Sequence, residues 1–229
     1  MTDEVTVKHA KGAHSALAHH FENLEQQREA GSLGMWAFLV TEIMFFGVLF
    51  MAYSLYRSLN GDAFAIGSGF LNVQLGTINT AVLICSSLTM ALAVWSAQAR
   101  TDKKLIIIFV VLTMILGMTF LGIKFTEYAH KWNEHLVPGI DFQYKGLYPG
   151  KVEMFLYIYF VMTGVHALHM IIGLGLMTWL LVKAVRGRFS PEYHAPVEIV
   201  GLYWHFVDVI WIFLFPLLYL IDRHIPPIH

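Results

Sequence analysis

The sequence predicts an all-α membrane protein, a polytopic helical bundle with five transmembrane helices. Hydrophobic residues make up 57% of the 229 residues and the mean hydropathy is +0.59, which is more apolar surface than a soluble domain of this size can cover. The formal net charge at pH 7 is −1, so the charge gives no reason to expect nucleic acid as a partner. A single cysteine excludes an intrachain disulfide and a cysteine-based metal cluster.

The five predicted spans are apolar stretches long enough to cross a bilayer, for which a helix needs roughly 20 mostly apolar residues. We place them at residues 33–57, 73–98, 104–126, 153–182 and 197–221. Short polar connectors join them, except that a longer stretch with proline and glycine separates the third and fourth spans and predicts an external loop. Residues 33–229 are therefore expected to form one membrane domain.

Residues 1–32 are polar and charged, and we expect them to form a cytoplasmic tail. They lack the short apolar core and small-residue cleavage site of a signal peptide, and Leu17 to Arg28 is predicted to form a short amphipathic helix. Lysine and arginine in short loops mark the cytoplasmic side of a membrane protein. These residues favour the side of the tail and of the second and fourth connectors, which predicts a cytoplasmic N-terminus and an external, periplasmic C-terminus.

Ionisable residues inside the spans are the main candidates for function. Glu42 lies near the middle of the first span, in "FLVTEIMFFGVLF", where a charge costs roughly 3 kcal/mol. We expect Glu42 to face protein and to be partnered, either as a carboxyl that handles protons or as a neutral acid hydrogen-bonded between helices. Lys124 and Glu127, one turn apart near the external end of the third span, are expected to pair as ordinary membrane-interface residues.

Histidines mark the last two spans. His205 and Asp208 are three residues apart, so they share a helix face and can hydrogen-bond each other in a polar clasp between helices. His166 and His169, in "TGVHALHMIIG", are placed in the same clasp; with His205 they could also be haem or metal ligands, although no carboxylate lies at ligand spacing. We favour helix packing over ligation, and we predict no metal site and no catalytic residue, because no nucleophile is evident near His205.

Basic residues surround the fourth connector. Such residues between helices can hold the phosphate of an anionic lipid, while topology alone is the other explanation for their position. The candidate lipid-binding residues are Lys183, Arg186, His194 and Glu198.

Five segments resemble, in order, the signatures of subunit III of the haem–copper oxidases, most closely the cytochrome c oxidase branch. They are "GMWAFLVTEIMFFGVLF", "LGTINTAVLICSS", "GIKFTEY", "MTGVHALHMIIG" and "EIVGLYWHFVDVIWIFLF". The resemblance runs from about His19 to Ile221 and covers every predicted span.

The resemblance implies an accessory core subunit that holds no cofactor of its own and is not catalytic alone. It would dock on oxidase subunit I in the bacterial cytoplasmic membrane, where the partner subunits hold the haem and copper. Its role would be to support stability, lipid binding and proton uptake while the complex reduces oxygen with electrons from cytochrome c. Further partners would be the other oxidase subunits, phospholipids and a larger respiratory supercomplex. The alternatives are subunit III of a quinol oxidase and the related accessory protein of a nitric oxide reductase.

The resemblance also assigns residues. Glu42 matches the intramembrane glutamate of the family that reacts with hydrophobic carbodiimides, and Lys183 and Arg186 match basic residues that approach lipid headgroups, although Lys183 replaces an arginine. The family pattern "H-x-x-x-E…W-H-F-V-D" is matched by His194, Glu198, His205 and Asp208.

The chain departs from the seven-helix members of the family, because their first two helices have no counterpart in the predicted spans. Those members hold phospholipids in a V-shaped cleft between a two-helix and a five-helix bundle. In a five-helix bacterial form, we expect a neighbouring subunit to complete the cleft.

Overall fold

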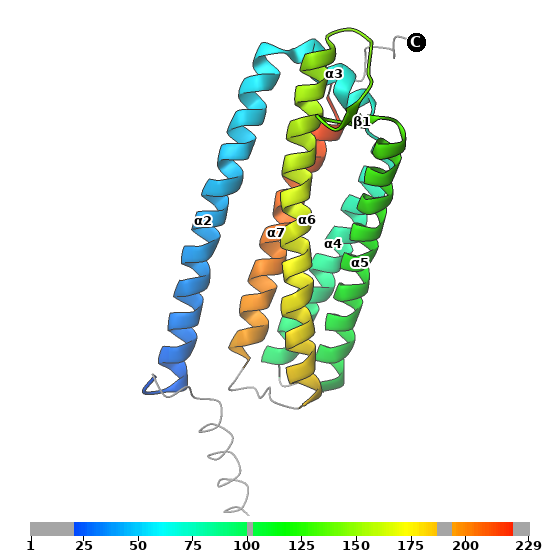
Figure 1. Ribbon diagram of the computed structural model, residues 1–229. Helices are drawn as coiled ribbons and strands as arrows, with labels where there is room; N and C mark the ends of the chain where they lie inside the picture. Colours follow the sequence, from blue (N-terminus) through cyan, green and yellow to red (C-terminus); the bar gives the residue numbers. More distant parts are fainter. Residues whose placement is uncertain (1–20, 100–102, 187–193, 222–229) are drawn as a thin grey trace, which may run out of the picture.

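The computed structural model describes residues 21–99, 103–186 and 194–221. In these ranges the chain forms six helices and one short β-hairpin (Figure 1). Five of the helices are long and apolar enough to cross a membrane, which confirms the predicted all-α fold class. The elements are α2 (Leu24–Leu59), α3 (Gly61–Gly69), α4 (Val73–Gln98), α5 (Lys103–Asn133), β1 (Leu136–Val137), β2 (Asp141–Phe142), α6 (Pro149–Val185) and α7 (Ala195–Tyr219).

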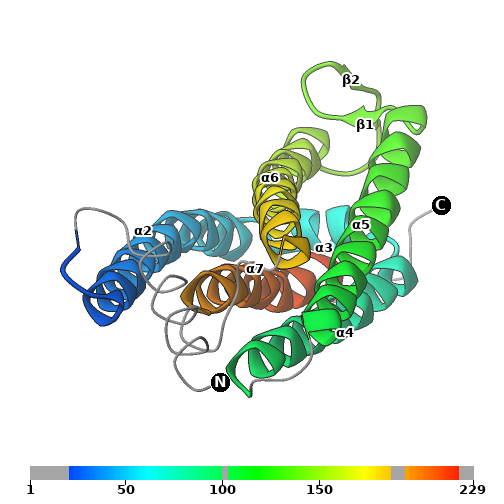
Figure 2. The same cartoon turned by 90° about the horizontal axis from the view of Figure 1, so that it is seen from below.

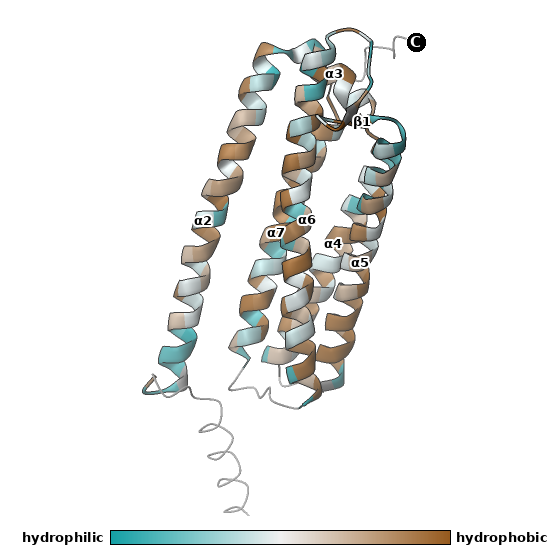
Figure 3. Cartoon of the chain, viewed as in Figure 1, coloured by the Kyte–Doolittle hydropathy of each residue, from teal (hydrophilic) through white to brown (hydrophobic). Residues whose placement is uncertain are grey.

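Helix α7 is the centre of the arrangement. It packs against α2, α4 and α6, while α5 lies beside α4 and α6 (Figure 2). In the most apolar 18-residue stretch of α7, 50% of the residues are buried, whereas in the corresponding stretch of α2 only 17% are buried. Helix α2 is therefore peripheral, and most of its apolar surface faces outward, where lipid or a neighbouring protein must cover it. Hydrophilic residues gather at the start of α2 and near the C-terminal end of α5 (Figure 3).

Helix α2 begins earlier than predicted. The Asn23 side chain caps it by accepting a 2.8 Å hydrogen bond from the amide of Gln26, so residues from Leu24 onward continue into the first span. The sequence predicts a separate short helix from Leu17 to Arg28, but the described residues of that segment from Leu24 onward belong to α2. Residues 1–20 lie outside the described ranges.

One narrow seam joins α2 to the bundle. Its buried hydrophobic residues, Leu39, Phe46 and Tyr53, recur every seven residues. The Tyr53 hydroxyl donates a hydrogen bond to the carbonyl of Leu217 in the last turn of α7. Carbonyls in the last turn of a helix have no partner within the helix, so this contact satisfies one of them and fixes the C-terminal end of α2.

Two connectors differ from the predicted irregular loops. The first contains α3, whose Phe64 is fully buried, with its ring centre 5.2 Å from that of Phe155 and 5.7 Å from that of Tyr53. The long connector between α5 and α6 contains the β1–β2 hairpin. Its turn uses Gly139 at φ +73, a backbone conformation that suits glycine, and the Gly139 amide donates to Glu153 of α6 at 3.0 Å.

The Trp204 side chain organises the middle of the bundle. It is fully buried, and its indole nitrogen donates to the Ser86 hydroxyl of α4 at 2.9 Å. The ring also lies against Gly117 of α5 and Gly173 of α6, where a Cβ atom would come within 2.8 Å and 2.9 Å of ring carbons. Three helices therefore meet at one indole, and the two glycines allow this close approach.

Replacing Gly173 by alanine should destabilise the bundle, because the new methyl group would overlap the Trp204 ring. We expect a loss of roughly 1–3 kcal/mol, as is typical of overpacking in a filled core. The matched control is Gly175→Ala on the same helix, where a Cβ meets no atom within 4 Å. Thermal unfolding in detergent should show a lower Tm for the first variant only; equal Tm values would contradict the tight contact.

Candidate functional site: polar contacts between the membrane helices

Glu42 is paired with His169, which joins α2 to α6. The distance from Glu42 Oε2 to His169 Nε2 is 3.1 Å, and the two side chains are 18% and 12% exposed. The other ring nitrogen, Nδ1, lies 2.8 Å from the Val165 carbonyl. A carbonyl can only accept, so Nδ1 carries a proton.

The proton on Nδ1 restricts the forms in which Glu42 and His169 can hydrogen-bond each other. With Nδ1 protonated, Nε2 and Oε2 share the remaining proton, either as a carboxylic acid donating to imidazole or as an imidazolium donating to carboxylate. Both forms have a net charge of zero. The pair therefore reduces the cost of placing an ionisable residue in a membrane helix, and this structure supplies the partner that the sequence alone did not name.

The predicted hydrogen bond between His205 and Asp208 is wrong. His205 Nδ1 instead lies 2.7 Å from the Ser87 hydroxyl of α4. Asp208 is 3% exposed, and neither of its carboxyl oxygens has a hydrogen-bond partner of standard geometry among the described residues, although Ser87 lies close to it. A three-residue step leaves side chains about 60° apart around a helix, so His205 and Asp208 can turn toward different neighbours.

The four residues of the predicted clasp do not form one cluster. His169 pairs with Glu42 of α2, and His205 pairs with Ser87 of α4. His166 is 1% exposed, and its ring centre lies 5.2 Å from that of Trp211 and 5.5 Å from that of Phe120. Across the described ranges, no three His, Cys, Asp or Glu side chains are placed to share a metal ion.

A buried ion pair lies between α5, α6 and α7. The predicted pairing of Lys124 with Glu127 is confirmed at 3.0 Å, and the two side chains are only 3% and 4% exposed, so the pair lies inside the helix bundle. The Lys124 amine also donates to the hydroxyls of Tyr159 at 3.1 Å and Tyr219 at 2.8 Å. Tyr219 in turn donates to the Glu127 carboxylate at 2.8 Å.

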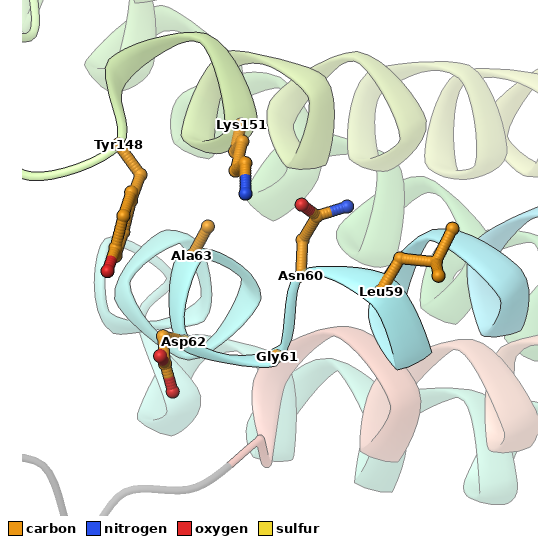
Figure 4. A pocket seen from close by; sticks show the side chains of 7 residues that line it. All are labelled: Leu59, Asn60, Gly61, Asp62, Ala63, Tyr148 and Lys151. Atoms are coloured by element: carbon orange, nitrogen blue, oxygen red, sulfur yellow. The ribbon is translucent and has the colours of Figure 1, made fainter.

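Two cavities lie at the end of the bundle that carries α3. A cavity of about 530 Å³ between the α3–α4 junction and α5 includes Glu127 in its wall, together with Lys131 and Glu134, which pair with each other. A smaller cavity of about 180 Å³ lies between the start of α3 and the start of α6. Lys151 and Tyr148 approach it from the α6 side and Asn60 from the α3 side (Figure 4). No sequence motif predicted either cavity.

Glu198 connects three helices at the end of the bundle where α2 and α7 begin and α4 ends. Its carboxylate accepts from Gln98 of α4 at 2.5 Å and lies 3.5 Å from Arg28 of α2 and 3.3 Å from His194 at the start of α7. Among the other candidate lipid-binding residues, the Lys183 amine lies 3.8 Å from the centre of the Trp179 ring, and Arg186 is the residue that ends α6. Lipid binding at these positions stays a prediction.

A sequence model of cytochrome c oxidase subunit III matches residues 15–222 of the chain. The chain belongs to this family. The haem–copper oxidase resemblance is thereby confirmed, and the chain is a multi-pass membrane protein of the subunit III type, a component of an oxidase complex.

Relatives of this subunit III chain cover almost its whole length. It is 29% identical to the probable quinol oxidase subunit 3 of Staphylococcus haemolyticus over 209 residues, which are 90% of this chain and 97% of the relative. It is 30% identical to the quinol oxidase subunit 3 of Bacillus subtilis over 200 residues, 86% of this chain and 91% of the relative. The probable quinol oxidase subunit 3 of Staphylococcus aureus (strain USA300) is 30% identical over 194 residues, 84% and 90% of the two chains.

Removing either charge of the Lys124–Glu127 pair should destabilise this subunit III chain by about 3–5 kcal/mol, because the remaining charge stays enclosed without its partner. Replacing both, Lys124→Met with Glu127→Leu, should recover most of that loss, since a buried pair can often be replaced by apolar residues. Folded protein remaining after heating in detergent measures the effect. The control is Lys104→Met, an exposed lysine near the start of the same helix. A double variant as unstable as the single ones would contradict the pairing.

Proposed function

We propose that this chain is the non-redox accessory subunit III of a bacterial respiratory haem–copper terminal oxidase, docked on subunit I in the cytoplasmic membrane. The match to the subunit III family over residues 15–222 carries the proposal. The contacts support it, because two pairs of ionisable groups inside the helices bind each other. Glu42 pairs with His169 and Lys124 with Glu127, which suits a scaffold. The haem and copper centres, and the reduction of oxygen, belong to the partner subunits.

Quinol is the electron donor that we propose for the complex. The sequence motifs favour the cytochrome c branch, with quinol oxidase as the alternative. The three relatives described above are all named as quinol oxidase subunits and align with at least 84% of this chain, which supports the alternative better. Their names give no support to a nitric oxide reductase partner.

We propose that bound phospholipid lies between α2 and the rest of the complex. Helix α2 is held to the bundle by polar contacts at three depths, and most of its surface is left exposed. Lys183, in the last turn of α6, and Arg186, its C-cap residue, are the candidates we favour for a lipid phosphate, because basic side chains at the end of a membrane helix can reach a lipid headgroup. The excess of lysine and arginine on the side of the tail supports a cytoplasmic N-terminus and an external C-terminus.

Purification of the intact complex through a tag on this chain tests the proposal. We expect co-purification with a haem- and copper-containing subunit I, and oxygen consumption with quinol but not with reduced cytochrome c. Recovery of the chain without any haem protein would overturn the function. Oxygen consumption with cytochrome c alone would overturn only the electron donor.

Replacing Glu42 by glutamine should leave the initial rate of oxygen reduction near that of the wild type, because an amide can still hydrogen-bond His169. Replacing it by leucine should leave the His169 ring without its partner, a loss of roughly 1–3 kcal/mol, and shorten the active lifetime of the complex in turnover. An oxygen electrode measures both the initial rate and the number of turnovers before inactivation. Immediate loss of activity in both variants would instead make Glu42 an obligate proton relay.

A further inference from the structure

His205 has an outward-facing nitrogen at the middle of a membrane helix. Its Nδ1 faces Ser87 inside the bundle at 2.7 Å. No described residue hydrogen-bonds its Nε2, and Nε2 is not among the fully enclosed polar atoms. The side chain as a whole is only partly buried. One hydrogen-bonding atom of His205 is therefore presented to the outside of the chain.

The depth of His205 makes this exposure unfavourable in lipid. Helix α7 begins at Ala195 and ends at Tyr219, so His205 lies about 15 Å from its start and about 21 Å from its end. Lipid tails at that depth offer no hydrogen-bond donor or acceptor. Polar side chains inside membrane helices usually face protein or a water-filled cavity. The free nitrogen thus indicates that another molecule covers this position.

His205 belongs to a partly exposed stripe of residues along α7. Helix α7 itself lies between α2 and α4 (Figure 2). On one side of the stripe Trp204 and His205 bind Ser86 and Ser87 of α4. On the other side, rings of α7 pack against rings of α2, with 6.3 Å between the centres of Phe206 and Phe46. The residues of the stripe recur at steps of three and four and are Leu202, His205, Val209, Ile212 and Pro216.

We propose that this α7 stripe is the docking face for a transmembrane helix of another oxidase subunit, which offers a hydroxyl or amide side chain to His205 Nε2. In this stripe His205 Nε2 is flanked by aliphatic residues one turn above and one turn below. A partner helix with one polar residue at mid-membrane depth would complement this pattern. A phospholipid does not match, because its hydrogen-bonding groups lie at the level of the headgroups. A hydroxyl or amide can donate or accept, so it suits either tautomer of His205. The inference rests on the proposed function, since it requires an oxidase complex.

Photo-crosslinking in intact membranes tests which molecule covers the stripe. We would place benzoylphenylalanine at Val209, which is 45% exposed, and as a control at Ile171 of α6, which is 49% exposed. The expected result is a covalent adduct between this chain and another oxidase subunit from position 209, identified by mass spectrometry, and none from position 171. Adducts from position 209 with lipid alone, or with a second copy of this chain, would overturn the docking face.

The same sample separates the inference from the proposed function. If oxidase subunits co-purify without irradiation and position 209 still gives only lipid adducts, the docking face is wrong and the function stands. If no oxidase subunit co-purifies, both are wrong.

Three variants separate docking from folding, with the fraction of chain retained on the complex after detergent washing as the readout. His205→Leu should be released roughly three- to tenfold faster than wild type, the change expected for one interhelical hydrogen bond in a membrane. His205→Gln should restore retention, since its amide can replace Nε2. Ser87→Ala removes only the contact inside the chain and should be retained like wild type. Equal release of the His205→Leu and Ser87→Ala variants would show that the effect is internal and would overturn the proposal.

Discussion

The absence of water inside a bilayer is the constraint on which this structure depends. A polar group at hydrocarbon depth is stabilised only by partners in protein, because lipid tails supply none. Glu42 meets His169, Lys124 meets Glu127 and two tyrosine hydroxyls, and the Trp204 indole meets Ser86. Each of these contacts joins different helices or fixes a side chain between them. Polar residues thus specify how the apolar helices are arranged, which apolar contacts alone specify weakly in a lipid environment.

The helices are not held equally. The four helices α4 to α7 surround buried residues such as Trp204 and Trp211, whereas α2 touches the bundle along one narrow seam. Its polar contacts, through Arg28 near its N-terminal end, Glu42 in the middle and Tyr53 near its C-terminal end, fix its tilt and rotation at three depths. An accessory subunit can use such an arrangement, since the flanks of α2 stay available to lipid and to neighbouring subunits.

The number of spans and the pairing of Lys124 with Glu127 were predictable because both follow from local sequence. A long apolar run and a three-residue step are visible in one stretch of chain. Helix α3 was not predictable, since its glycines and serine are typical of a loop and only the packing of Phe64 on Phe155 shows that it is buried. The partners of Glu42 and His205 lie 127 and 118 residues away in the sequence, so spacing could place these groups on a face but could not say what they touch.

A double-mutant cycle between Glu42 and His169 tests the central claim most directly. The free energy of unfolding would be measured in bilayer-like discs for Glu42→Leu, His169→Leu and the combined variant. If the pair fastens α2 to α6, the coupling energy should be about 0.6–1.7 kcal/mol, the range found for hydrogen bonds between membrane helices. Strictly additive losses would contradict the account, because Glu42 and His169 would then stabilise the chain independently of each other.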